Sequence, residues 1–239
     1  MRFREAASLG LVVLVLAATT VRADGLIATL PKDGTGASYS LKIRGSKDGQ
    51  EQMVSGRLTL SSVGSEVKDG QPCRWIELGF IVKDGEQEFG DYSKFLILEK
   101  HLRPGNNPLQ HVIKAWRRRG PKDAPVKAFT TPEDSLQGPL PVFLSGPLDK
   151  PKKLPAKEIE SALGKLECTG VTGAYKYKSK TGSVTGTIEL RHHAKSPFGV
   201  VAATYDMTIK QGERTEKFRF DLKLAKITTK AKPVLISPK

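Results

Sequence analysis

The 239-residue chain has little of the chemistry from which active sites are usually built. It has two cysteines and four histidines, namely His101, His111, His192 and His193. It lacks the serine-hydrolase, phosphate-loop, dinucleotide-binding and zinc-protease motifs. Neighbouring residues on a strand point to opposite faces, so His192 and His193 are poorly placed to share a metal ion. We therefore predict no catalytic residue, no metal site and no cofactor, and we expect that the protein is not an enzyme.

Acidic residues also give no clear catalytic arrangement, since acid–base catalysis needs carboxylates gathered in a cleft. Glu77 is the one carboxylate within a strongly apolar segment, Arg74 to Val82. Burial would perturb it as a functional group. Alternatively, it pairs with a lysine or arginine on a neighbouring strand, which is the more common outcome.

Long hydrophobic runs are absent except at the N-terminus. A basic start, residues 1–4, precedes an apolar run from Leu9 to Ala18, and small or β-branched residues follow at Val21 and Ala23. This layout predicts a signal peptide, residues 1–23, that is cleaved on export to the periplasm or the extracellular space. An uncleaved anchor is the alternative, but the run is about half the roughly 20 residues that a spanning helix needs. We expect no transmembrane segment after cleavage.

Acidic residues are outnumbered by basic ones, and the whole chain has a net charge of +14. Residues 1–23 contain three arginines and one glutamate, so the mature chain would carry +12. Lysines spread along strands usually form a solvated surface that protects sheet edges. The alternative is attraction to an anionic envelope component. Export argues against nucleic acid as a partner, and the cluster Arg117–Arg119 is short.

Cysteine is scarce, but Cys73 and Cys168 make an even count in a chain that we expect to be exported. This favours one disulfide between them. It would stabilise the fold by roughly 4 to 5 kcal/mol in the chain-entropy model. The alternative is two buried free thiols, which pack as small hydrophobic groups.

Alternating polar and apolar residues dominate what the chain does contain. Lys-Asp-Gly occurs at residues 32–34, 47–49, 68–70 and 83–85, and Asp-Gly is a preferred centre of tight turns. The segments between these turns alternate with a period of two, which is typical of half-buried antiparallel strands. Similar patterns predict C-terminal strands at 165–178, 183–192, 200–209 and 215–227. The fold class is therefore mainly β, with a curved antiparallel sheet or half-barrel.

The remaining segments predict a helix, an excursion and a tail. Leu109, Val112, Ile113 and Trp116 recur at helical spacing after Asn107, which predicts one packed helix at about 108–119. Ten of the fifteen prolines lie within residues 103–155, so residues 120–155 form a long proline-rich excursion. It would be either a lid or a segment that shields the sheet. We expect one β-rich domain, residues 24–230, and a loose basic tail, residues 231–239.

A sheet curled around a cavity would be lined by the large apolar side chains. The cavity-lining candidates are Trp75, Phe80, Trp116, Phe143 and Phe198. Such a cavity would bind or carry a lipophilic envelope component. An ordinary filled core is the alternative for each of them. An electrostatic binder of an anionic envelope polymer and a structural envelope protein are the competing functions, and a hydrolase fits less well.

Four short segments carry a resemblance to known proteins, namely Leu30–Thr35, Gly70–Leu78, Pro108–Trp116 and Pro197–Val201. Their order resembles an uncharacterised family of exported bacterial proteins. It is more distantly similar to the periplasmic lipoprotein-carrier superfamily, whose fold is a curved antiparallel half-barrel closed by helices. The resemblance implies a fold rather than an activity and transfers no catalytic residue. It would place Pro197–Gly199 at a strand entry near the cavity mouth.

Overall fold

One curved, unclosed antiparallel sheet of eleven strands makes up most of the described chain. The computed structural model describes residues 25–47, 50–84, 87–103, 105–120, 124, 126–129, 140–144, 146, 148–178 and 182–236, so the expected signal peptide lies outside it. The strands are β1 (Gly36–Lys47), β2 (Gln50–Lys68), β3 (Gln71–Asp84), β4 (Gln87–Leu98), β5 (Val112–Gly120), β6 (Lys127–Phe129), β7 (Asp149–Ser161), β8 (Gly164–Lys178), β9 (Ser183–His192), β10 (Val200–Gln211) and β11 (Arg214–Thr228).

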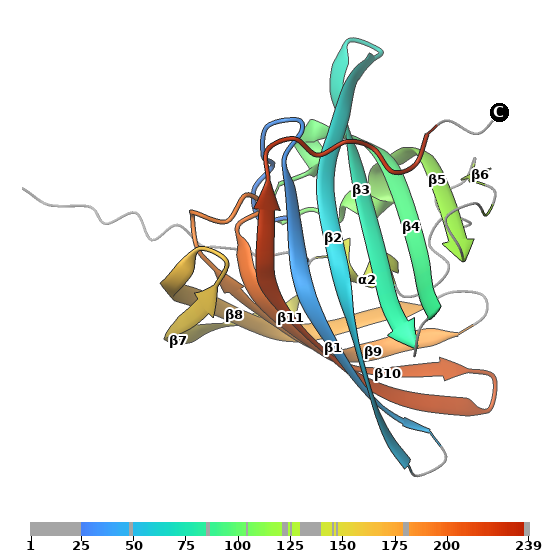
Figure 1. Ribbon diagram of the computed structural model, residues 1–239, viewed down its shortest axis with the longest axis vertical. Helices are drawn as coiled ribbons and strands as arrows, with labels where there is room; N and C mark the ends of the chain where they lie inside the picture. The colour runs from blue at the N-terminus through green and yellow to red at the C-terminus, as the bar shows by residue number, and fades with distance from the viewer. Residues whose placement is uncertain are drawn as a thin grey trace, which may run out of the picture.

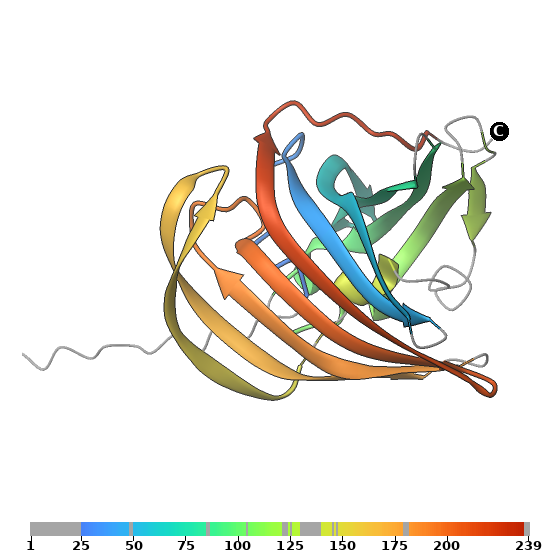
Figure 2. The same ribbon diagram turned by 60° about the horizontal axis from the view of Figure 1, so that its bottom comes forward.

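The order of strands places the first and last long strands side by side. It runs β6-β5-β4-β3-β2-β1-β11-β10-β9-β8-β7. Two antiparallel meanders therefore meet along the β1–β11 pair, where Leu41 lies opposite Leu222. Figures 1 and 2 show both meanders bending toward the same side, which gives the sheet a concave and a convex face. The predicted mainly β, curved antiparallel fold is confirmed.

The predicted period-two pattern explains which residues face the concave side. Tyr39 and Leu41 of β1 are buried there, while the intervening Ser40 is exposed. The β2–β3 turn has Asp69 at φ 50° and Gly70 at φ 72°, the pair of positive angles that a tight hairpin turn requires. Local turn chemistry and burial of one face thus specify the same hairpin.

Short segments of the chain itself fill the concave side. Residues 25–30 and helix α2 (Leu140–Leu144) lie against the sheet, and we call them together the inner plug. The Leu26 N–H donates to the Phe143 carbonyl at 2.8 Å. The Ala28 N–H donates to the carbonyl of Phe198, at 2.9 Å, in the turn before β10. The concave side is therefore a packed core in this state.

The predicted helix at about 108–119 is wrong. Pro108–His111 forms only a short 3₁₀ helix, η2, and residues 112–120 form strand β5. Asn107 does cap η2, since its side chain accepts from the Leu109 N–H at 3.1 Å. Pairing with β4 satisfies the backbone of β5, where Ala115 lies opposite Phe95. The apolar spacing that suggested a helix instead divides between the two faces of a strand, because tertiary pairing overrides local propensity.

The predicted disulfide between Cys73 and Cys168 is also wrong. Both cysteines are fully buried free thiols. Cys73 lies on β3 and Cys168 on β8, and five strands separate β3 from β8. Neighbouring strands are about 4.8 Å apart, whereas a disulfide needs Cα atoms within about 7 Å. The two thiols pack in separate apolar clusters, as small hydrophobic groups do.

The described part of the tail packs on the sheet, and the excursion contains short regular elements. The tail was expected to be loose from residue 231, yet its described part, through residue 236, runs over the convex face of the sheet. Leu235 is fully buried. The excursion at 120–155 contains β6, α2 and the start of β7. None of the helices among the described residues has the length and apolar character needed to cross a membrane.

Candidate functional site

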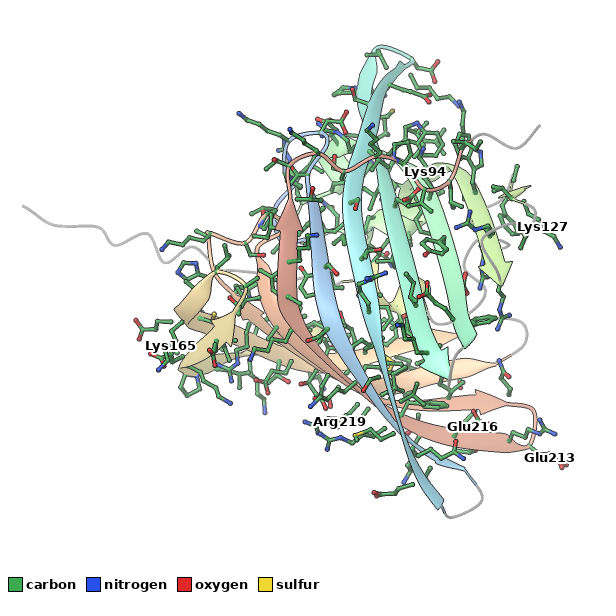
Figure 3. The ribbon with its side chains drawn as sticks, in the orientation of Figure 1. Lys94, Lys127, Lys165, Glu213, Glu216 and Arg219 are labelled. Atoms are coloured by element: carbon green, nitrogen blue, oxygen red, sulfur yellow. The ribbon has the colours of Figure 1, made fainter. Side chains whose placement is uncertain are left out.

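The most elaborate polar site lies on the convex face of β3, β4 and β5. We call Trp75, Glu77, Lys94 and Trp116 the outer clamp, and residues 229–236, which run across it, the C-terminal strap. Lys94 lies directly opposite Glu77 on β3 and directly opposite Trp116 on β5. Cross-strand partners share one face, so the four side chains form a contiguous group. Figure 3 shows Lys94 where the strap passes over the sheet.

Glu77 holds the main chain of the strap. Its Oε1 accepts from the Val234 N–H at 2.9 Å, and its Oε2 accepts from the Leu235 N–H at 2.8 Å. The side chain is nearly completely buried. Burial raises the pKa of Glu77, while the two amide hydrogen bonds and the charge of Lys94 oppose that rise. The carboxylate thus binds two consecutive peptide groups whatever their side chains are.

Lys94 holds the next main-chain group of the strap. Its Nζ donates to the Leu235 carbonyl at 3.2 Å. The same ammonium lies 5.0 Å from the centroid of Trp75 and 4.9 Å from that of Trp116, which is within cation–π range. Burial lowers the pKa of Lys94, and the charge of Glu77 opposes this. The two indoles therefore stabilise a cation in a site that is largely removed from water.

Glu66 of β2 holds one of the two tryptophans, Trp75. The Trp75 Nε1–H donates to Glu66 Oε1 at 2.7 Å, and Lys114 Nζ lies 3.3 Å from Glu66 Oε2. This hydrogen bond from Trp75 lowers the pKa of Glu66. The ring centroids of Trp75 and Trp116 are 4.6 Å apart. The two indoles thus pack against each other, and a hydrogen bond to Glu66 also orients Trp75.

The strap presents alternate residues to the sheet and to solvent. Leu235 is fully buried, whereas Val234 is 48% exposed and Ile236 is 71% exposed. Farther back, the Ala231 N–H donates to the Gly34 carbonyl at 2.7 Å, and Ala231 packs on the cluster around Trp75. The chain bends at Val234 and Leu235, so that two consecutive N–H groups reach the same carboxylate. The strap is thus bound as a bent segment with one fully buried side chain.

The five predicted cavity-lining residues do not gather in one place. Phe80, Phe143 and Phe198 belong to the concave core. Trp75 and Trp116 lie on the convex side in a different cluster. Two hollows among the described residues, of about 130 and 470 Å³, are lined by none of the five.

Polar groups are few on the concave side, and one of them lacks a partner. The Tyr39 hydroxyl donates to the Val200 carbonyl at 3.2 Å. The Tyr205 hydroxyl is fully buried and has no hydrogen-bond partner among the described residues. Burial raises the pKa of both phenols, so both stay protonated at neutral pH. Phe143 of the inner plug packs edge-on against Tyr205, with ring centroids 5.0 Å apart.

Sequence reasoning singled out Glu77 and both tryptophans but missed Lys94 and Leu235. It expected Glu77 either to be perturbed by burial or to pair with a basic residue on a neighbouring strand. The structure shows the burial, and Lys94 lies opposite Glu77 on β4, where its charge opposes the rise in the pKa of Glu77. Lys94 is the one charged residue in the run Ser93–Leu98, which was a usable signal. Leu235 had no such signal, because an isolated leucine in a basic tail resembles many unbound termini.

Comparisons with known proteins give weak likenesses of fold. No family model matches the chain, and no curated protein matches it. Among solved structures, a DUF1329 family protein from Desulfovibrio piger is 9% identical, with a TM-score of 0.33, 82% of this chain covered and 85% of that one. A protein with a YmcC-like fold from Bacteroides fragilis, named as a proposed exported protein, is 8% identical, with a TM-score of 0.34 and coverages of 82% and 97%.

A third likeness is to a β-barrel-like protein of the DUF1849 domain from Brucella abortus. It is 13% identical, with a TM-score of 0.28, and the alignment covers 84% of this chain and 98% of that one. At such identities and TM-scores these likenesses say nothing about function. The resemblance to lipoprotein carriers stays a prediction.

Proposed function

We propose that the protein is exported and that it binds or carries a lipophilic envelope component, without catalysis, on the concave side of its sheet. The proposal rests on how the concave side of the sheet is covered. Among the described residues, a large apolar face from both meanders is covered by short segments and not by a second sheet. These segments are the small inner plug, the turn at Phe198, and the stretch that carries Leu102 and Leu109. A lipid chain that displaces the plug would find an apolar surface already formed by the strands.

The inner plug has the properties of a removable cover. Helix α2 has only five residues, and its residues Val142, Phe143 and Leu144 are buried. The ring of Phe143 lies edge-on against both Tyr205 and Phe220. Burying a phenylalanine side chain contributes roughly 1.5 to 3 kcal/mol, a contribution that a buried alkyl chain could replace.

Tyr205 would supply a polar contact in such a complex. A buried hydroxyl without a partner costs about 1 to 3 kcal/mol. A ligand with an ester or carboxyl oxygen near the end of its alkyl chain would accept a hydrogen bond from this group. Since Tyr39 and Tyr205 stay protonated, they can orient such a ligand but cannot act as bases.

Lipid binding can be tested on the unmodified protein. Protein purified from its own envelope would be analysed by native mass spectrometry. A second sample would be incubated with vesicles of phosphatidylethanolamine and phosphatidylglycerol, separated from them, and analysed in the same way. We expect phospholipid bound in a fixed stoichiometry. Absence of lipid in both samples would overturn the proposal.

A pair of phenylalanine variants tests whether the lipid enters beneath the plug. Phe143→Ala shortens the plug where it covers Tyr205, whereas Phe89→Ala removes a ring that is 42% exposed on β4. We expect Phe143→Ala to bind severalfold more lipid from vesicles and Phe89→Ala to match the unmodified protein. Equal binding by both variants would exclude the concave side. The cost of Phe143→Ala is about 3 to 5 kcal/mol, so circular dichroism must first show that it folds.

A second candidate function is electrostatic binding of an anionic envelope polymer, which the edge strand β7 favours. Lys150, Lys152, Lys153 and Lys157 of β7 are exposed and make no ion pair within the described part of the chain. Replacing these four by serine should abolish binding to an anionic polysaccharide, and wild-type binding should weaken between about 50 and about 200 mM salt. Replacing Lys165, which pairs with Glu158 at 3.3 Å, is the control.

A further inference from the structure

The outer clamp has the features of a site that recognises main-chain groups at a bend. Three consecutive strap groups, the N–H of Val234 and the N–H and carbonyl of Leu235, bind two side chains of opposite charge. The clamp lies on the opposite face of the sheet from the proposed lipid side. We propose that the outer clamp is a binding site for a peptide segment that bends at an aliphatic residue, and that the C-terminal strap is its resident, exchangeable occupant.

The clamp contacts main-chain groups that every residue has, and it selects a side chain at one position only. Glu77 accepts from two main-chain N–H groups and Lys94 donates to a main-chain carbonyl, so these bonds place no demand on the side chains at 234 and 235. Selectivity comes from position 235, where the side chain is fully buried, while its neighbours on both sides face solvent. The ligand class is therefore a bent segment with an aliphatic residue of leucine size between two unconstrained positions.

Charge within the clamp explains why it needs an occupant. Glu77 is buried, and its carboxylate oxygens bond to the strap amides. Without the strap amides, the buried carboxylate would keep only the positive charges of Lys94 and Arg118 to stabilise it. A buried charge that loses its hydrogen-bond partners is strongly unfavourable. An empty clamp would thus favour binding any segment that restores these two N–H donors.

Tethering explains why the strap is normally in place and yet exchangeable. A segment tied to its site by a short linker has an effective concentration of about 1 mM. A separate peptide with the same contacts competes only near that concentration, unless the strap is prevented from docking. Loss of the strap contacts would therefore convert a closed site into one that captures a peptide from solution.

The chain provides its own reporter for occupancy. Trp75 and Trp116 are its only tryptophans, and both belong to the outer clamp. Their emission therefore depends on whether the strap excludes water from this site. No labelling is needed to follow binding.

The test uses the full-length chain and a synthetic peptide with the sequence of residues 229–239. Leu235→Asp puts a charge at the fully buried position and should prevent docking, whereas Ile236→Asp puts the same charge on the exposed neighbour. We expect red-shifted tryptophan emission and greater acrylamide quenching for Leu235→Asp, and wild-type behaviour for Ile236→Asp. Leu235→Ala replaces Leu235→Asp if circular dichroism shows that the aspartate variant does not fold.

Adding the peptide should reverse the effect. We expect saturable recovery of the wild-type emission in Leu235→Asp, at peptide concentrations below about 1 mM. No recovery is expected in the double variant with Glu77→Gln or with a peptide that carries the Leu235→Asp change. A folded Leu235→Asp variant that shows no response to the peptide would overturn the proposal. So would equal responses of the Leu235→Asp and Ile236→Asp variants before peptide is added.

Discussion

At the end of β9, two adjacent histidines differ in burial. His192 is 8% exposed, and its Nε2 has no hydrogen-bond partner among the described residues, whereas His193 is half-buried. Burial lowers the pKa of His192 to about 4. In the unfolded chain a histidine titrates near 6.5. Between these values only the unfolded state binds the proton, so acidification favours unfolding.

We expect His192 to make the protein less stable at low pH. The free energy of unfolding should fall by about 2 kcal/mol from this residue alone as the pH drops from about 7.5 to about 5. His192→Gln should lose much of this dependence, whereas His193→Gln should keep it. Urea unfolding at the two pH values measures the effect. The quantity compared is the change in the free energy of unfolding between the two pH values, because a glutamine buried at position 192 also lowers stability at each pH. Identical pH dependence in both variants would contradict the assignment.

At the scale of single elements, η2 and β5 show where a sequence pattern is ambiguous. Asn107 and Pro108 signal a helix start, and a helical turn does begin there. Whether the chain then continues as a helix or as a strand depends on the availability of β4 as a partner, and Phe95 pairs with Ala115 across that ladder. The sequence alone could not reveal this, because it does not show which strands become neighbours.

We expect the cap of η2 to contribute measurably despite the shortness of the helix. Asn107→Ala removes the acceptor for the Leu109 N–H and should lower the free energy of unfolding by about 1 kcal/mol. Asn107→Asp should retain most of the stability. Asn106→Ala is the matched control, because its amide makes only a long 3.4 Å hydrogen bond to the Lys100 carbonyl. A cost for Asn106→Ala equal to that for Asn107→Ala would exclude the cap as the cause.

The candidate site also has parts that the sequence could predict and parts that it could not. Period-two alternation with Asp-Gly turns identified most long strands, since one buried face constrains each residue in turn. The faces of Phe80 and Trp75 follow from that alternation. Their division between two clusters does not, because it requires knowing that the strap and the plug cover opposite sides of the sheet. Strap docking depends on long-range contacts with Glu77 and Lys94, which no local pattern encodes.

For the molecule as a whole, the absence of the predicted disulfide has a direct consequence. Stability must come from packing, because Cys73 and Cys168 are free and buried. Burial raises the pKa of Cys168, which further lowers its reactivity.

We therefore expect reductant to leave the protein unchanged. The urea midpoint should be the same with and without dithiothreitol. If a disulfide were present, reduction would lower the free energy of unfolding by roughly 4 to 5 kcal/mol, and the midpoint would fall. A thiol reagent should modify neither cysteine in the native state and both after unfolding. A midpoint that drops on reduction would show that the two cysteines are linked.

The pairing of β1 with β11 also governs the order in which the chain can fold. Gly36 lies opposite Thr228, so the seam between the two meanders joins nearly the whole length of the chain. Each meander can form from local hairpins, but the seam must wait until the last strand has been synthesised. Until then β1 has an unpaired edge, and such edges invite pairing with other chains. The most aggregation-prone moment for this protein is thus the interval just before its final strand emerges.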